Sequence, residues 1–223
     1  THWRLVLPSS LRELAIRACH DDPLHGGHLV FVGMYARLRQ RFFWVRMAQD
    51  VTQYIAAYHS CTARKTPLHL SSVPAQSFHA ARPFELVSLD FMGPLPRSHA
   101  GNEYILVVTD HYTRWVEAFA TPSADAQTVA RLLLTEIITR YGALTRLLSD
   151  RGTHFLNEVV AALCHLFRIR KVTTTAYNPR CNGMTERFNW TLADMISHYV
   201  QEDPATWDEY LPLVLHAYRT TPH

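Results

Sequence analysis

Three consecutive strand-like segments between residues 85 and 120 restrict the fold of this chain more than any other feature of its sequence. They read ELVSLDFMG, EYILVVTD and TRWVEAFA, and a short turn around His111 and Tyr112 joins the second to the third. The first segment alternates and is typical of a strand, and the other two are interpreted as further strands. Successive strands with short connections predict neighbours in one sheet.

Helical and strand-like patterns alternate after these segments. A helix is expected over 125–141, with Gly142 placed to end it. The strand TRLLS, the helix NEVVAALCHLF and the strand IRKVTTT follow, then a long helix from about Gly183 to Val200 and a last helix after Pro204. This order predicts an α/β fold, a five-stranded mixed sheet flanked by helices on both faces.

The first part of the chain has a different pattern. Residues 9–21, 32–43 and 47–60 show the apolar spacing of helices, whereas 66–80 are rich in Pro and Ser and lack any period. The predicted organisation is therefore a small helical module over 1–65, a linker over 66–80 and a larger domain over 81–223.

Positive charge is concentrated at the front of the chain. Residues 1–75 carry nine Arg or Lys against four acids, and the remainder carries thirteen against fifteen, which together give the net charge of +3. A basic front half suits a polyanionic partner. Ordinary surface charge explains the same counts, so the partner stays open on charge alone.

Two classes of protein are disfavoured by composition. No run of about 18 apolar residues predicts a membrane span, and no signal-peptide pattern opens the chain. The spacing of the cysteines offers no disulfide framework and indicates a reducing compartment. The four are Cys19, Cys61, Cys164 and Cys181, of which Cys164 is expected to be a small buried apolar residue.

Three acids stand where a site is expected. Asp90 interrupts an apolar strand, where a carboxylate is costly unless the strand end meets water or metal. Asp150 directly follows the strand TRLLS, and strand ends in α/β sheets are where sites gather. Glu186 lies in the first turn of a helix but off its apolar stripe. Taken singly, Asp150 could be a turn residue and Glu186 could complement the helix N-terminus.

Taken together, the three carboxylates suit hard divalent metals. Such metals prefer oxygen ligands, and two of them about 3.5–4 Å apart can clamp the attacking and leaving oxygens of a phosphoryl displacement. No protein nucleophile is needed, because water or a nucleic-acid hydroxyl can attack.

Longer motifs resemble a known family. The run RPFELVSLDFMGPLPRSHAGNEYILVVTDHYTRWVEAF, followed in order by SDRGTHF, TTTAYNP, NGMTERFNWTL and WDEYLPLVLHAYRTTPH, resembles the integrase of gypsy-class (Metaviridae) LTR retrotransposons, in the retroviral integrase superfamily. The thirty-five residues between Asp150 and Glu186 match that family's spacing. The resemblance covers nearly the whole chain.

The resemblance implies a function. It implies an RNase H-like core in which Asp90, Asp150 and Glu186 hold two Mg²⁺ (or Mn²⁺) ions and catalyse 3′-end processing and DNA strand transfer. It also implies element ends and target DNA as partners, a homo-oligomer, and a nuclear location with cytoplasmic retroelement particles as a precursor stage.

Other positions are interpreted beside the three acids. Asp110, in VVTDHYT, is expected to be a turn-capping carboxylate rather than a metal ligand. Asn182 and Gly183 are expected to form a loop that approaches DNA, where Gly183 permits close backbone approach. Arg187 could contact phosphate or be solvated, and Trp190 could stack on a base.

The front module resembles a His-His-Cys-Cys zinc unit that has degenerated. His20 and His28 match the two histidines and Cys61 matches one cysteine, but Tyr58 stands where the other cysteine is expected. His59 could substitute, although its offset from Cys61 strains a tetrahedral site. Further candidates are His25 and Cys19. Alternatively, these histidines are surface residues of a weakened bundle.

Three functional hypotheses follow. The first is an integrase competent for DNA strand transfer, indicated by the three acids in register. The second is a decayed or host-adopted nucleic-acid-binding module without integration activity, indicated by Tyr58 and by Trp190 and Ala193 at positions where the family places basic residues. The third is an RNase H-type nuclease, which the acid spacing and the front module disfavour.

Overall fold

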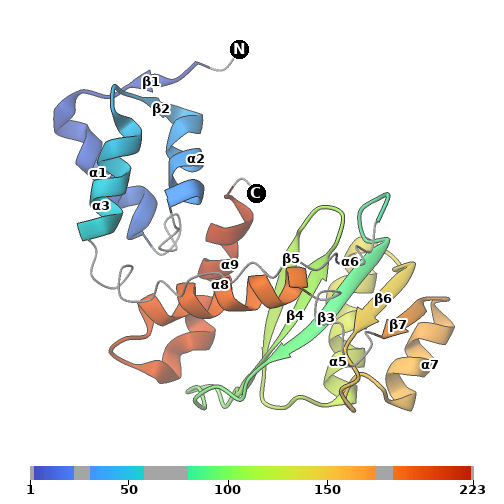
Figure 1. Ribbon diagram of the computed structural model, residues 1–223. Coiled ribbons are helices and arrows are strands. Elements are labelled where there is room, and N and C mark those ends of the chain that lie inside the picture. The colour runs from blue at the N-terminus through green and yellow to red at the C-terminus, as the bar shows by residue number, and fades with distance from the viewer. Residues whose placement is uncertain (1–2, 23–30, 58–79, 174–182, 222–223) are drawn as a thin grey trace. The chain divides into compact units, whose positions relative to one another are not determined.

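The described part of the chain falls into two compact units. The computed structural model describes residues 3–22, 31–57, 80–173 and 183–221. Unit 1 draws on Thr1–Ser72, Ala193–Asp203 and Glu209–His223, and unit 2 on Val73–Leu192 and Pro204–Asp208 (Figure 1). The predicted boundaries at residues 65 and 80 stay predictions.

Unit 2 is built on a five-stranded mixed sheet. Its strand order is β5-β4-β3-β6-β7; β3 pairs antiparallel with β4 and parallel with β6, and the pairs β4–β5 and β6–β7 continue these directions. The strands are β3 (Leu86–Met92), β4 (Tyr104–Asp110), β5 (Val116–Thr121), β6 (Arg146–Ser149) and β7 (Arg170–Thr173). The predicted α/β class and the RNase H-like arrangement of the sheet are confirmed.

One face of the sheet carries the apolar core. Val87 and Leu89 of β3 are fully buried and pack in one cluster with residues of the covering helices, including Val160 and Cys164. Cys164 is thus the small buried residue that was predicted. The covering helices are α5 (Ala126–Leu132), η1 (Leu133–Ile138), α6 (Thr139–Tyr141) and α7 (Glu158–Leu166). Gly142 ends this run at φ +88°, a backbone angle that favours glycine.

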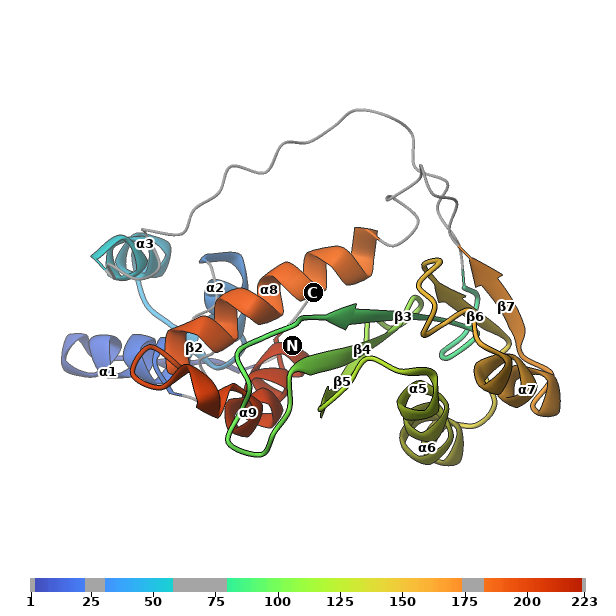
Figure 2. The same cartoon turned by 90° about the horizontal axis from the view of Figure 1, so that it is seen from below.

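The opposite face of the sheet receives the first turns of α8 (Gly183–Tyr199). Side chains alternate along a strand, so Ser88 and Asp90 point away from the core that holds Val87 and Leu89. The hydroxyls of Ser88 and Thr185 are hydrogen-bonded at 2.6 Å, and both residues are fully buried. In Figure 2, α8 accordingly lies on one side of β3, and α5 and α7 lie on the other.

Unit 1 is a small helical bundle with a short parallel β-pair. Arg37 joins the front of the chain to its end: its guanidinium donates to the Ala217 carbonyl at 2.5 Å and to the Thr220 and Thr221 hydroxyls at 2.8 Å, near the end of α9. The elements are α1 (Ser9–His20), α2 (Phe31–Arg41), α3 (Met47–Ala57), β1 (Leu5–Val6), β2 (Phe42–Phe43), part of α8 and most of α9 (Trp207–Arg219), which follows η3 (Pro204–Thr206). Among the helices described here, none has the length and apolar character to cross a membrane.

Candidate active site

Asp90 and Asp150 lie shortly after the paired residues of two adjacent parallel strands, β3 and β6. Each paired residue of β3 lies opposite the β6 residue sixty positions later, from Leu86 with Arg146 to Ser88 with Leu148. Continued for two more residues, that register sets Asp90 beside Asp150, which directly follows β6. The carboxyl ends of two adjacent parallel strands therefore present one acid each.

Neighbouring groups orient both carboxylates. Asp90 is half-buried; its Oδ2 accepts from Asn189 Nδ2 at 2.7 Å and its Oδ1 accepts from the Phe91 N–H at 3.0 Å. Asp150 is exposed, and its Oδ1 accepts from the Gly152 N–H at 2.8 Å. These hydrogen bonds hold both carboxylates in defined orientations at the strand ends.

The third acid belongs to the first turn of α8. Two contacts attach this turn to β3: Thr185 to Ser88, and Asn189 to Asp90. The backbone of Glu186 lies between these anchoring residues, and its side chain lies outside the described residues. Sequence reasoning missed Asn189. Its position three residues after Glu186 could have identified it, because residues three apart in a helix lie on the same side and Asn189 is therefore near the acidic site.

Two side chains lie close to Gly152 in the turn after Asp150. A Cβ on Gly152 would lie 2.6 Å from His154 Nε2 and 3.0 Å from Asp150 Oδ1, so a larger residue would have to displace one of them. The His154 ring packs edge-on against Phe91, with ring centroids 5.0 Å apart. Sequence reasoning singled out neither Gly152 nor His154.

Breaking the hydroxyl pair that anchors α8 should cost stability. Thr185→Val preserves shape but leaves the buried Ser88 hydroxyl without this partner, so we expect the free energy of unfolding to fall by about 1–2 kcal/mol. The double variant Ser88→Ala/Thr185→Val removes both hydroxyls and should recover most of that loss. Urea unfolding measures both variants. A double variant as unstable as the sum of the single changes would show that the pair is not coupled.

Asp110 belongs to a turn and not to the acidic site. Its side chain is 1% exposed; Oδ1 accepts from the Phe84 N–H at 3.0 Å, and Oδ2 accepts from the Thr113 N–H at 2.9 Å and the Thr113 hydroxyl at 2.5 Å. The two Thr113 contacts close the connection between β4 and β5 and confirm the predicted capping role, whereas the Phe84 contact ties the segment before β3 to the end of β4.

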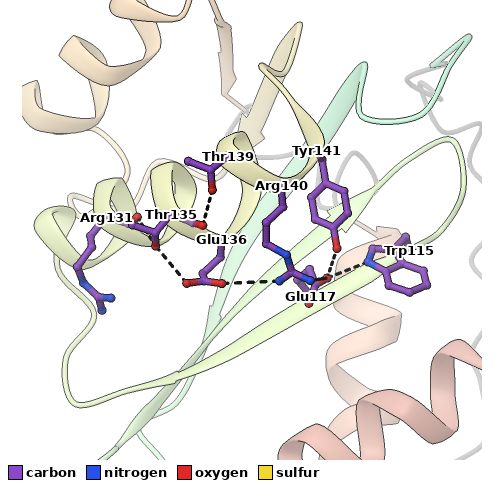
Figure 3. A network of polar contacts seen from close by, with 8 residues as sticks. All are labelled: Trp115, Glu117, Arg131, Thr135, Glu136, Thr139, Arg140 and Tyr141. Atoms are coloured by element: carbon purple, nitrogen blue, oxygen red, sulfur yellow. Dashed lines mark hydrogen bonds and ion pairs between the residues drawn. The ribbon is translucent and has the colours of Figure 1, made fainter.

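A second buried acid of this unit, Glu117 on β5, is also structural. In Figure 3, Trp115, Tyr141 and Arg140 converge on Glu117. Trp115 Nε1 donates to its Oε1 at 3.0 Å, the Tyr141 hydroxyl donates at 2.5 Å, and Arg140 lies 3.9 Å away. Burial and the nearby carboxylate raise the pKa of Tyr141. This network fixes the end of α6 on the edge strand, and sequence reasoning did not find it.

The candidate DNA-contacting residues lie at the start of α8 and just before it. Gly183 is the first residue of α8, and Asn182 lies outside the described residues. Arg187 is exposed, and Trp190 is 79% exposed. Both side chains are therefore accessible to a ligand, and their contact with DNA stays a prediction.

Of the proposed zinc ligands, the structure describes His20. It is fully buried, and its Nδ1 lies 2.7 Å from Asp21 Oδ1, while the Tyr54 hydroxyl donates to Asp21 Oδ2 at 2.9 Å. A carboxylate beside one ring nitrogen is also found in zinc-binding histidines, where it orients the ring so that the other nitrogen can meet the metal. The sequence analysis missed Asp21.

Most of the remaining zinc candidates lie outside the described residues, and the exception is Cys19. His28, His59 and Cys61 lie outside the described residues, as do Tyr58 and His25. Cys19 is half-buried, and burial raises the pKa of its thiol, which disfavours the thiolate that zinc prefers. Within the ranges that the structure describes, no group of three or more His, Cys, Asp or Glu side chains could hold a metal.

The sheet order and the acids at its adjacent strand ends define an integrase-type polynucleotidyl transferase core. Residues 7–67 match the family described as integrase zinc binding domain, and residues 80–179 match the integrase core domain. The chain therefore contains an integrase zinc-binding domain and an integrase core domain.

Relatives by sequence are retroelement proteins. The chain is 29% identical over 216 residues to the retrovirus-related Pol polyprotein from transposon 412 of Drosophila melanogaster, which covers 94% of this chain and 17% of that protein. It is 24% identical over 220 residues to the human gypsy retrotransposon integrase-like protein 1, and this alignment covers 98% of this chain and 41% of that protein. The chain thus spans less than half the length of either relative.

Solved structures show the same fold. The catalytic core domain of BIV integrase is 29% identical, with a TM-score of 0.51 over 63% of this chain and 86% of that one. A chain of the simian T-cell lymphotropic virus intasome, in complex with PP2A regulatory subunit B56 gamma, is 20% identical, with a TM-score of 0.57 over 75% of this chain and 59% of that one. The second likeness concerns the fold alone.

Proposed function

We propose that this chain is a retrotransposon integrase that trims the 3′ ends of its element and joins them to target DNA. The observation that supports the proposal is the β3–β6 register, which would bring Asp90 level with Asp150 if it continued for two more residues, together with the contacts of Thr185 and Asn189 on either side of Glu186. The element ends and target DNA are the proposed substrates, a homo-oligomer the proposed assembly, and the nucleus the proposed location.

The donor set fits divalent magnesium or manganese. Asp90 and Asp150 supply carboxylate oxygens, the ligands these metals prefer, and Glu186 is the proposed third ligand. Asn189 Oδ1 is buried without a hydrogen-bond partner among the described residues, so this amide leaves a free acceptor beside Asp90. Two such ions, when bound, would stabilise the attacking and leaving oxygens of an in-line phosphoryl transfer.

The surrounding residues hold these ligands in place. Asn189 fixes Oδ2 of Asp90, and the Gly152 N–H fixes Oδ1 of Asp150. The Ser88–Thr185 pair sets the start of α8 against β3, which fixes the position from which Glu186 projects. Catalytic groups held by such supporting contacts lose less freedom when the substrate binds.

The decisive experiment uses a branched DNA that mimics the product of strand transfer. Purified chain is incubated with this DNA and Mg²⁺ or Mn²⁺, and we expect metal-dependent resolution of the branch. The reverse reaction makes the smallest demand on the front module and on any segment outside this chain. A folded chain that binds the DNA without resolving it, under either metal, would overturn the proposal.

A second candidate function is a nucleic-acid-binding module without integration activity. The observation in its favour is the pair of departures at Tyr58, where a zinc-binding cysteine is expected, and at Trp190, where a basic residue is expected. DNA binding without branch resolution would select this alternative.

Zinc binding offers a separate test of the front module. Tyr58→Cys would supply the missing thiolate, and we expect bound zinc to rise towards one ion per chain. His20→Ala, introduced into that variant, should lower the zinc content again. Mass spectrometry of the metal content after dialysis measures both the rise and the fall in bound zinc. Zinc that stays unchanged in Tyr58→Cys would mean that the module has lost more than one ligand.

A further inference from the structure

A basic hollow in unit 1 is not used by either proposed metal site. It has a volume of about 480 Å³ and lies where β1 and β2 meet α2 and the start of α3. Three arginines and three aromatic residues account for most of its lining. These six residues are Arg4, Tyr35, Arg39, Phe43, Trp44 and Arg46.

The three arginines converge on the hollow from separate segments. Arg4 precedes β1, Arg39 lies in the last turn of α2, and Arg46 lies in the turn before α3. All three are exposed, and their guanidinium groups have no hydrogen bond or ion pair with any described residue. Three such cations around one hollow attract phosphate, to which guanidinium groups bind in a bidentate manner.

Aromatic side chains supply a second kind of contact. Phe43 is 49% exposed, whereas Trp44 is buried and its Nε1 donates to Asp50 Oδ2 at 2.7 Å. Tyr35 is half-buried and stacks on Phe31, with ring centroids 5.4 Å apart. The hollow therefore combines an exposed aromatic ring with neighbours whose rings are already held in place. Unpaired bases stack on such rings.

Arg46 has a backbone conformation that suits glycine better. Its φ is +67°, in the left-handed region that disfavours residues with a Cβ. Its carbonyl accepts from the N–H groups of Gln49 and Asp50 at the start of α3, so the turn is fixed. Strained residues of this kind concentrate at functional sites. Arg46 thus combines a strained backbone with a guanidinium that has no ion pair among the described residues, and both features favour a binding role for its side chain.

We propose that this hollow binds a single nucleic-acid strand, with phosphates on Arg4, Arg39 and Arg46 and an unpaired base against Phe43 and Tyr35. A duplex offers the same phosphates but no free base face, so a single strand satisfies the whole lining. All of these residues belong to unit 1. The inference therefore stands or falls independently of catalysis at Asp90 and Asp150.

The test measures binding of a fluorescent oligothymidylate of about twelve nucleotides by anisotropy, over a series of salt concentrations. In the full chain, Arg46→Gly should weaken binding about tenfold and reduce the slope of log affinity against log salt by about 0.7. Glycine suits the backbone at this position, so the variant should unfold at no lower temperature than the parent. A loss of binding therefore cannot be assigned to unfolding.

Two further variants separate the contacts. Phe43→Leu keeps an apolar side chain in β2 and removes the ring, and we expect about tenfold weaker binding with an unchanged salt slope. Arg17→Ala is the matched control, because Arg17 is an exposed arginine of the same unit outside the hollow; it should change affinity no more than about twofold.

Photocrosslinking locates the bound strand. An oligonucleotide that carries 5-iodouracil should crosslink to the peptide containing Phe43 or Tyr35, and Arg46→Gly should reduce that product. Crosslinks confined to unit 2, or wild-type affinity and salt slope in Arg46→Gly, would overturn the proposal. Equal binding of duplex and single strand, with no effect of Phe43→Leu, would also overturn it, because the hollow would then be a surface for phosphate alone.

Discussion

Asp150→Asn is expected to reduce metal-dependent resolution of branched DNA by about a thousandfold, which is the scale of losing one preorganised electrostatic group at a reacting phosphate. The substitution removes a charged ligand and leaves the fold intact. Asp150 is exposed, and the amide oxygen of Asn can still accept from the Gly152 N–H. Product formation at fixed time, with Mg²⁺ and with Mn²⁺, gives the rates.

Matched variants make this result specific to the proposed site. Asp90→Asn and Glu186→Gln should show losses of the same size, because each removes one charge and one ligand. Glu158→Gln is the control: Glu158 is an exposed acid in the first turn of α7, and its loss should leave the rate within about twofold. Parent-like activity in any of the three site variants would remove that acid from the proposed metal site.

Asp110→Ala is expected to lower the free energy of unfolding by about 3 kcal/mol, since it leaves buried donors without their acceptor. The carboxylate is 1% exposed and accepts from two backbone N–H groups and one hydroxyl. Asp110→Asn retains one acceptor oxygen and should lose about half as much. Urea unfolding measures both variants.

The same two variants distinguish a structural carboxylate from a catalytic one. Branch resolution per folded molecule should be unchanged in Asp110→Asn, because its side chain contacts Thr113 in the β4–β5 connection and Phe84 before β3, and none of the three site acids. A large loss of rate in a folded Asp110→Asn chain would mean that this acid contributes to the site.

The main elements of the fold were predictable from periodicity, whereas short elements were not. The pattern over 32–43 predicted one helix, but Phe42 and Phe43 leave it to pair with Leu5 and Val6. Two residues are too few to show a period, and only the tertiary partner selects the strand. Likewise, the apolar stripe over 125–141 predicted one regular helix and gave no sign that Leu133–Ile138 forms a π-helix.

Some residues of the candidate site were likewise predictable from the sequence, and others were not. Asp90 and Asp150 were predictable as strand-end acids, because a carboxylate inside or directly after an apolar strand is unusual. The hydrogen bonds that hold these two acids in place were not predictable from the sequence. The bond from Asn189 to Asp90 depends on how α8 meets β3, which the Ser88–Thr185 pair determines. Asn, Ser and Thr are common in helices and strands, so the local sequence offered little signal for these contacts.

The β3–β6 register restricts how members of this family can change in length. Within the paired residues, Leu86 to Ser88 and Arg146 to Leu148, one inserted or deleted residue would turn the following side chains to the other face of the sheet. Asp90 or Asp150 would then face the apolar core. Length changes are therefore expected in the connections, such as the turn at Gly101 or the segment after Gly142, so alignments of diverged copies should show gaps there and an uninterrupted block through both strands.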